Sequence, residues 1–161
     1  SRIPEKIRLK SLKIADLVSK SLNHVGLIAV ELFCTHNDDV LVNEIAPRVH
    51  NSGHLTIESC ITSQFEQHIR AIYDLPLGNV DQILPSVMVN LVGENNHSGE
   101  AFYRNIDKAF DLDQVYPHLY GKKITKPYRK MGHITIMDKK LEKAISKARI
   151  LKNTIKIIST K

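Results

Sequence analysis

Glycine and proline are scarce in this sequence of 161 residues, which contains seven glycines and six prolines and no repeated or low-complexity segment. With 42% hydrophobic and 25% charged residues, this composition excludes a collagen-like repeat and an intrinsically disordered chain. Two cysteines are too few for a disulfide scaffold, and we expect Cys34 and Cys60, each in apolar surroundings, to be reduced core residues of a cytosolic protein. The longest apolar run, 25–34, is interrupted by Glu31 and falls short of the roughly 20 residues of a membrane-spanning helix. The length is that of one ordinary globular domain with a sizeable core.

A signal peptide and an initiator methionine are also missing from the sequence. It begins Ser1-Arg2-Ile3-Pro4 and continues almost at once with a helical pattern. We interpret this start as that of a processed protein or of a piece of a longer one.

The charge is positive, with 23 Lys and Arg against 17 Asp and Glu and a formal net charge of +6. This charge permits nucleic-acid or phosphate partners. No series of aromatic residues interleaves the lysines, however, and there is no zinc-finger or RNP signature. Nucleic-acid binding is therefore the weaker hypothesis. The positive charge is explained at least as well by a protein that binds phosphorylated small molecules.

Hydrophobic periodicity predicts a mixture of helices and strands. The expected helices are an amphipathic one over 7–22, one over 57–72, a short one at 107–110 and a lysine-rich one at 141–151. The expected strands are 25–34, covered on both faces, and 40–46, paired as a hairpin, followed by 86–92, 115–120, 133–137 and 154–158. The composition changes near Leu84, which indicates a small C-terminal subdomain.

Glu31 lies inside an apolar strand, where an ionised carboxylate is costly to bury without a partner. If the hairpin loop has four residues, 36–39, or two, 37–38, Glu31 is directly opposite Glu44, whereas a loop of three or five residues breaks that pairing. Directly opposed carboxylates destabilise a hairpin, and a divalent cation such as Mg²⁺ would explain their placement. The alternative is that one glutamate pairs with a lysine or arginine while the other lies at the solvent edge.

A polar loop, Pro47-Arg48-Val49-His50-Asn51-Ser52-Gly53-His54, follows the second glutamate. Loops between a strand and a helix are common places for anions and substrates to bind, and an ordinary connection does not need so many hydrogen-bonding groups. We predict functional roles for Arg48 and His50, and we interpret His54 as a helix-capping surface residue.

These segments resemble the ATP-grasp enzymes, and most closely the 5-(carboxyamino)imidazole ribonucleotide synthase family, the ATPase subunits of phosphoribosylaminoimidazole carboxylase. Two opposed acidic residues indicate only an ATP-grasp protein, whereas the Pro-Arg-x-His-Asn-Ser-Gly-His and Arg-Lys-x-Gly-His loops are much more specific. The resemblance covers nearly the whole chain and is carried by residues 26–33, 42–54, 62–68, 75–78, 119–122 and 129–133.

The resemblance implies an α+β fold. Residues 1–83 would form the C-terminal part of an ATP-grasp domain, an antiparallel sheet with helices, and 84–161 a small β-rich subdomain that closes the substrate pocket. Glu31 and Glu44 would hold Mg²⁺, or Mn²⁺, between the phosphates of ATP. Asn43 and Glu44 would lie at the nucleotide.

The resemblance also implies a set of polar and cationic residues that bind the substrates: Arg48, His50, Asn51, Ser52, Lys122 and Arg129. Among these, Arg48, His50 and Lys122 would be catalytic, because they place hydrogen-bond donors where charge develops. We interpret the helix residues Gln64, Glu66 and His68 as packing or surface residues.

The implied reaction converts ATP and bicarbonate into ADP and carboxyphosphate and then carboxylates the amine of 5-aminoimidazole ribonucleotide, in purine biosynthesis. The resemblance implies a homodimer, and the cysteines and the short apolar runs lead us to expect a cytoplasmic protein without a membrane partner. The N-terminal substrate-binding domain and the lid over ATP that the family uses have no counterpart in this sequence, so we expect a fragment without the N-terminal half and inactive alone. The alternatives are a basic nucleic-acid or interaction module without catalysis, or a different purine-pathway ATP-grasp transferase.

Overall fold

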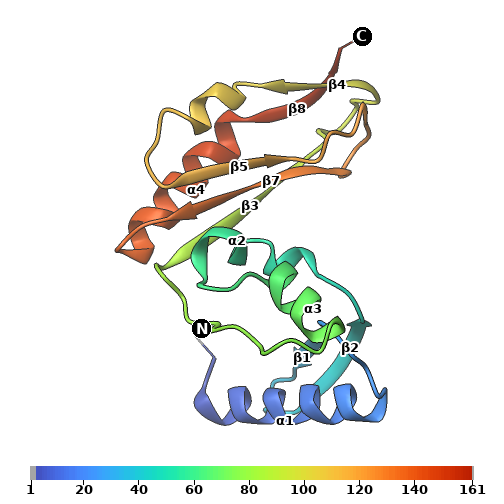
Figure 1. Ribbon diagram of the computed structural model, residues 1–161. Helices are drawn as coiled ribbons and strands as arrows, with labels where there is room; N and C mark the ends of the chain where they lie inside the picture. Colours follow the sequence, from blue (N-terminus) through green and yellow to red (C-terminus); the bar gives the residue numbers. More distant parts are fainter. Residues whose placement is uncertain (1–2, 161) are drawn as a thin grey trace. The chain divides into compact units, whose positions relative to one another are not determined.

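The computed structural model describes residues 3–160, so Ser1, Arg2 and Lys161 lie outside the described part of the chain (Figure 1). The chain divides into two compact units, of which the first comprises Ser1–Gly53 and Thr62–Asn79 and the second comprises His54–Ile61 and Val80–Lys161. The predicted division into 1–83 and 84–161 stays a prediction. From residue 3 to residue 160, no helix combines the length and the apolar character needed to cross a membrane.

In the first unit, helix α1 (Glu5–Ser21) lies beside a two-stranded antiparallel hairpin of β1 (Ala29–Cys34) and β2 (Val40–Ala46) (Figure 1). Ile7 is the buried residue of the helix, at 3% exposure. The ammonium of Lys10 donates to the carbonyl of Asp38 at 2.8 Å, which ties the helix to the hairpin loop. The predicted helix and second strand are confirmed, and the first strand begins later than expected.

The apolar side chains of the hairpin are largely exposed. Phe33 is 60% exposed and Leu41 54%. The prediction that the first strand is covered on both faces is therefore wrong for this structure, because a two-stranded hairpin with one helix beside it cannot cover both faces. Cys34 is exposed and Cys60 half-buried, so neither is a core residue, although both are free thiols as expected.

The single helix predicted over 57–72 is wrong as well, because the chain breaks it in the middle. Cys60 adopts an extended conformation and bridges to Gln82, and the side chain of Ser63 then accepts a hydrogen bond from the amide of Glu66 to cap a new helix. The chain forms three short helices here: η1 (Asn51–Gly53), α2 (Thr56–Ser59) and α3 (Gln64–Ile72).

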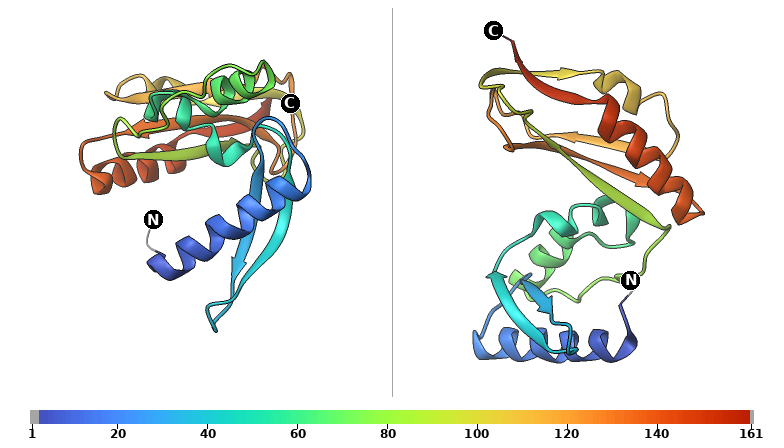
Figure 2. Two further views of the ribbon diagram at one scale, coloured as in Figure 1. Left: turned by 60° about the horizontal axis from the view of Figure 1, so that its bottom comes forward. Right: turned by 180° about the vertical axis from the view of Figure 1, so that it is seen from behind.

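The second unit contains two antiparallel three-stranded sheets. The strand order is β3-β7-β5 in one and β6-β4-β8 in the other, and α4 packs on β3 and β7 (Figure 2). The elements are β3 (Ser86–Val92), β4 (Gly99–Arg104), η2 (Ile106–Ala109), β5 (Val115–Leu119), β6 (Ile124–Thr125), β7 (Lys130–Met137), α4 (Leu141–Thr154) and β8 (Lys156–Thr160). The sequence analysis missed β4 and β6, since β4 is short with polar ends and β6 has two residues.

Alternation along β7 separates the core of this unit from a polar face. Ile134 and Ile136 are fully buried and pack into the apolar cluster with Leu151 of α4. His133 and Thr135, between and beside them in the strand, point to the opposite face because successive side chains alternate. Both are nonetheless buried, at 2% and 0% exposure, so the strand carries buried polar groups as well as apolar ones.

Candidate functional site

The hairpin places Glu31 directly opposite Glu44, as predicted, but by a different route. Near the loop, the ladder pairs Leu32 with Val42, and the loop itself has five residues, 35–39. If this register continued along the hairpin, Glu31 would not be opposite Glu44. A β-bulge between Glu31 and Leu32 leaves Asn43 as the extra residue and restores the pairing. The expected two- or four-residue loop is therefore wrong, and the expected pair is confirmed.

The carboxylate of Glu31 has two polar neighbours in the same unit. The side-chain amide of Asn43 donates to its Oε2 at 3.4 Å, and the Nε2 of His50 lies 3.4 Å from its Oε1. The backbone N–H of Ser52 donates to the Nδ1 of His50, so we assign the proton of the neutral imidazole to Nε2, facing the carboxylate. Four of the predicted site residues thus lie close together in this unit: Glu31, Asn43, Glu44 and His50.

The loop after β2 is held by its own short-range contacts. The backbone N–H of Arg48 donates to the carbonyl of Ala46 at 2.8 Å, and the guanidinium donates to the carbonyl of Val49 at 3.0 Å. The hydroxyl of Ser52 lies 2.8 Å from His50 Nδ1. Arg48 is exposed, whereas His50 has a side-chain exposure of 19%. The imidazole is therefore fixed in place and the guanidinium stands at the surface.

Gln64, interpreted from the sequence as a packing or surface residue, holds this loop from α3. Its Oε1 accepts from the backbone N–H of His50 at 3.0 Å, and its Nε2 donates to the carbonyl of His50 at 2.9 Å. The residue is 6% exposed, and a Cβ on Gly53 would lie 2.5 Å from its Oε1. A glutamine at the start of a helix, close behind a loop of hydrogen-bonding residues, is the sequence signal that could have identified this contact.

The other two helix residues, Glu66 and His68, also make structural contacts. The carboxylate of Glu66 pairs with Arg70 one turn later. The Nδ1 of His68 accepts from the backbone N–H of Leu27 at 2.9 Å, which fastens α3 to the segment before β1.

In the second unit, the two predicted substrate-binding cations lie on the connection between β5 and β7. The ammonium of Lys122 donates to the carbonyl of Lys130 at 2.6 Å, and the guanidinium of Arg129 donates to the carbonyl of Ile124 at 2.7 Å. Lys122 is half-buried, and Arg129 is exposed. Both cations are therefore attached to the backbone of their own loop.

A cluster of imidazoles lies on the polar face of the same sheet. The rings of His118 and His133 are opposite one another in the β5–β7 ladder and stack, with centroids 4.5 Å apart and planes 11° apart. The Nε2 of His118 donates to Glu58 of α2 at 2.6 Å. Burial, together with the nearby charges of His118 and His54, lowers the pKa of His133 to about 4. His133 is therefore neutral at pH 7.

His54 belongs to this cluster, and its interpretation as a helix-capping surface residue is wrong. It is half-buried, and its ring centroid lies 5.2 Å from that of His133. The residue before α2 in the N-cap position is Leu55.

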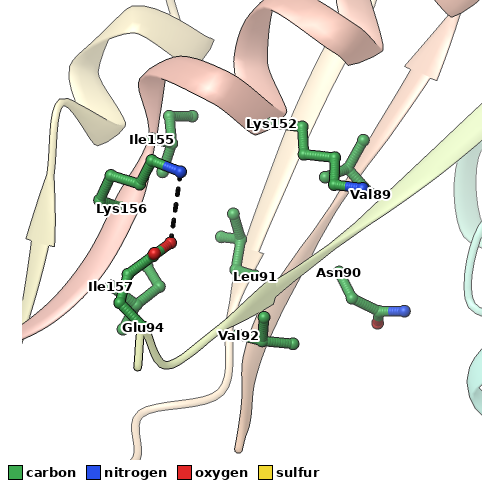
Figure 3. Close-up of a pocket in the computed structure, with 9 residues that line it drawn as sticks. All are labelled: Val89, Asn90, Leu91, Val92, Glu94, Lys152, Ile155, Lys156 and Ile157. Atoms are coloured by element: carbon green, nitrogen blue, oxygen red, sulfur yellow. Dashed lines mark ion pairs between the residues drawn. The ribbon is translucent and has the colours of Figure 1, made fainter. Parts of the chain in front are cut away.

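A cavity of about 100 Å³ in the second unit lies elsewhere, between β3, the end of α4 and β8 (Figure 3). Its lining is mainly apolar, with an ion pair of 3.4 Å between Lys156 and Glu94. It contains none of the predicted site residues.

Two family models match the two parts of the chain. Residues 1–65, which include the hairpin, match the ATP-grasp domain, and residues 86–147 match the phosphoribosylaminoimidazole carboxylase C-terminal domain. The chain thus combines part of an ATP-grasp domain with a phosphoribosylaminoimidazole carboxylase C-terminal domain, as expected from the sequence.

Individual relatives indicate a particular enzyme within the ATP-grasp superfamily. The chain is 45% identical over 137 residues to the N5-carboxyaminoimidazole ribonucleotide synthase of Bacillus subtilis, covering 85% of this chain and 34% of the relative. The crystal structure of N5-carboxyaminoimidazole ribonucleotide synthetase from Thermotoga maritima is 48% identical with a TM-score of 0.90, covering 99% of this chain and 45% of that one. The Aspergillus clavatus enzyme, solved with ADP and 5-aminoimidazole ribonucleotide, is 33% identical with a TM-score of 0.81, covering 94% of this chain and 41% of that one.

Over most of its length the chain is therefore similar to the N5-carboxyaminoimidazole ribonucleotide synthases, which are ATP-grasp proteins. It spans about a third of the length of the Bacillus subtilis relative and less than half of either solved structure.

Proposed function

We propose that this chain contributes the metal-binding hairpin and part of the substrate site to an ATP-dependent carboxylase. A bicarbonate oxygen would attack the γ-phosphorus of ATP to form carboxyphosphate and release ADP. The amine of 5-aminoimidazole ribonucleotide would then attack the carboxyl carbon and release inorganic phosphate, giving N5-carboxyaminoimidazole ribonucleotide. The observation that carries the proposal is the pairing of Glu31 with Glu44 beside His50. The ADP and 5-aminoimidazole ribonucleotide bound to the similar Aspergillus clavatus enzyme support this assignment of the substrates.

The hairpin would hold Mg²⁺, with Mn²⁺ as a substitute. Carboxylate oxygens are the hard ligands that these ions prefer, and Glu31 and Glu44 supply them on adjacent strands. Two carboxylates also suit Mg²⁺ because it keeps positions for phosphate oxygens and water. The ion would neutralise phosphate charge during transfer. Asn43, the bulged residue beside Glu31, would contact the nucleotide together with Glu44.

The polar loop and the basic connection would bind the anionic substrates. We assign bicarbonate, carboxyphosphate and ribonucleotide contacts to Arg48, His50, Asn51, Ser52, Lys122 and Arg129. An arginine can grip a phosphate or carboxylate with two parallel hydrogen bonds, and a lysine acts as a point charge. Arg48, His50 and Lys122 would also place donors where negative charge develops in the transition state.

The exposed apolar side chains of the first unit support a further partner, the N-terminal half of an ATP-grasp enzyme. Leu17 of α1 is 66% exposed, and Phe33 and Leu41 of the hairpin are 60% and 54% exposed. Large exposed apolar groups on neighbouring elements are typical of surfaces that another segment covers. We propose that this half completes the ATP site and that the 161-residue chain alone does not turn over.

We also propose that the completed enzyme is a cytoplasmic homodimer. The support is the family resemblance, with no residue of this chain assigned to the dimer contact. Sedimentation equilibrium of the completed enzyme tests it, because a mass of one protomer contradicts the dimer.

A chimaera tests the proposed activity. The region of the Thermotoga maritima synthetase that matches this chain is replaced by the 161-residue sequence, and ADP release is measured with ATP, bicarbonate and 5-aminoimidazole ribonucleotide. We expect release that depends on all three, whereas the isolated chain gives none. An inactive but folded chimaera contradicts the proposal.

Matched variants in the chimaera separate the metal pair from other charge changes. Glu31→Gln and Glu44→Gln should each abolish turnover, whereas Asp39→Asn, in the loop of the same hairpin, should not. Turnover that survives both glutamate changes removes the hairpin from the mechanism. Tight binding of a polynucleotide with a steep salt dependence would instead support the interaction-module alternative.

A further inference from the structure

Tyr120 is held at two points in the second unit. Its hydroxyl lies 2.9 Å from the Nδ1 of His133, and its backbone N–H donates to the carbonyl of Met131 at 3.0 Å. The ring of His54 meets the tyrosine ring edge-on, with centroids 6.3 Å apart. Since His133 is itself 2% exposed and stacked on His118, the hydroxyl is anchored to a side chain that has little freedom to move.

The fixed tyrosine ring lies beneath the ammonium of Lys122. The Nζ atom is 5.5 Å from the ring centroid, within the range of a cation–π contact. The same ammonium donates to the carbonyl of Lys130 at 2.6 Å, so it is held by a second contact as well. A lysine has four rotatable side-chain bonds, and these two contacts restrict an otherwise mobile group.

We propose that His133 and Tyr120 are positioning residues for Lys122: the imidazole anchors the tyrosine hydroxyl, and the anchored ring sets the place of the ammonium. This inference rests on the proposed function, in which Lys122 binds an anionic group of the ribonucleotide. Neither His133 nor Tyr120 contacts the reacting groups in this role. They act on substrate affinity by reducing the number of places that the ammonium can occupy.

The chain offers a closely matched control for the tyrosine. Tyr116 lies on β5, and its hydroxyl bonds to the side chain of Gln114 at 3.3 Å. Tyr120 directly follows the end of the same strand. Tyr120→Phe and Tyr116→Phe therefore remove the same atom from neighbouring positions, but only the first breaks the contact with His133. For the imidazole, Asn places a polar atom near the position of Nδ1, so His133→Asn should retain part of the effect that His133→Leu loses.

The first test is made on the 161-residue chain and needs no activity. In a proton NMR spectrum, the ring of Tyr120 should shift the ε-methylene resonance of Lys122 upfield. We expect Tyr120→Phe to reduce this shift, His133→Leu to abolish it, and both Tyr116→Phe and His133→Asn to preserve most of it. A Lys122 resonance that stays unchanged in Tyr120→Phe and His133→Leu overturns the proposal.

The second test is kinetic and uses the chimaera with 5-aminoimidazole ribonucleotide as the varied substrate. We expect Tyr120→Phe to raise KM for the ribonucleotide by about two- to fivefold and to lower kcat by no more than the same factor, while KM for ATP stays unchanged. A merely structural role would change both KM values or the melting temperature alone. The double variant Tyr120→Phe/His133→Leu should be no worse than His133→Leu, since the two residues act in series.

The two proposals fail in different ways. If the unsubstituted chimaera does not release ADP, the proposed function fails, and the NMR result still decides the position of Lys122. If it does release ADP but Tyr120→Phe and His133→Leu keep the wild-type KM for the ribonucleotide, the positioning role fails and the proposed function stands.

Discussion

Glu31 lies directly opposite Glu44 across the β1–β2 hairpin because the bulge at Asn43 offsets a loop with an odd number of residues. A one-residue change in register would turn one glutamate to the other face of the hairpin. The bulge also brings the amide of Asn43 to 3.4 Å from the Oε2 of Glu31. One irregularity in the ladder therefore both pairs the carboxylates and adds a polar neighbour to them.

The first prediction concerns the repulsion between this pair. Without a divalent cation, Glu44→Gln should raise the stability of the chain by about 0.5 kcal/mol, because it removes a like-charge pair on opposed strand positions. Thermal melts in a chelator check this, with Asp39→Asn as the control for a charge lost elsewhere in the hairpin.

The same variant tests the metal site. Added Mg²⁺ should raise the melting temperature of the wild-type chain, because an ion that binds only the folded state stabilises it. It should have no such effect on Glu44→Gln. An equal increase in both proteins would contradict the assignment of the hairpin as the metal site.

The second prediction concerns the contact between Gln64 and the backbone of His50. Gln64→Leu removes two hydrogen bonds and should cost about 2 kcal/mol of stability. It should also speed hydrogen exchange at the amide of His50, which is the donor to Gln64. Exchange followed by NMR measures this effect.

Gln67 provides the control, because it makes the same two-way contact with the backbone of Gly78. Gln67→Leu should cost a similar amount of stability. In this variant the amide of His50 should exchange more slowly than it does in Gln64→Leu. If the two variants accelerate that amide equally, Gln64 does not hold the loop in particular.

The third prediction follows from the pKa of His133, which is lowered from its ordinary 6.5 to about 4. Between these values the unfolded chain binds a proton that the folded chain does not, so stability should fall as the pH decreases from about 6.5 to about 4. The full difference is about 3 kcal/mol. The ionisable groups around the imidazole are His118 and Tyr120 on the β5 side and His54 and Glu58 on the α2 side.

Urea unfolding at a series of pH values checks this dependence. His133→Asn should have a flatter profile in the acidic range, whereas His36→Asn, at an exposed position in the hairpin loop, should follow the wild type. Equal slopes for all three proteins would show that another group causes the loss.

The fourth prediction concerns the two thiols. Cys34 is exposed and Cys60 half-buried, so iodoacetamide should alkylate Cys34 faster, because access limits the reaction of a covered thiol. Mass spectrometry of peptides at successive times measures both rates. Faster labelling of Cys60 would be inconsistent with the exposures of the two side chains.

Local patterns in the sequence were enough to predict the helices and strands that have an uninterrupted hydrophobic period or apolar run. The 3.6-residue period of α1, the apolar runs of β2, β3 and β7, and the approximate place of α4 were all predicted, because each depends on neighbouring residues. The opposed glutamates were predicted as well, but from an expected two- or four-residue loop, and their pairing in the structure depends on the bulge at Asn43. The motifs of the polar and basic loops were sufficient to identify the family.

Only the tertiary structure decided which side chains complete these local features. The break between α2 and α3, the bulge at Asn43 and the hold of Gln64 on His50 all depend on partners distant in the sequence. His133 was part of a recognised motif, but its stacking on His118 and its contact with Tyr120 arise only when β5 and β7 pair. A sequence pattern specifies which face a residue takes, whereas its charge state and contacts are set by what packs against that face.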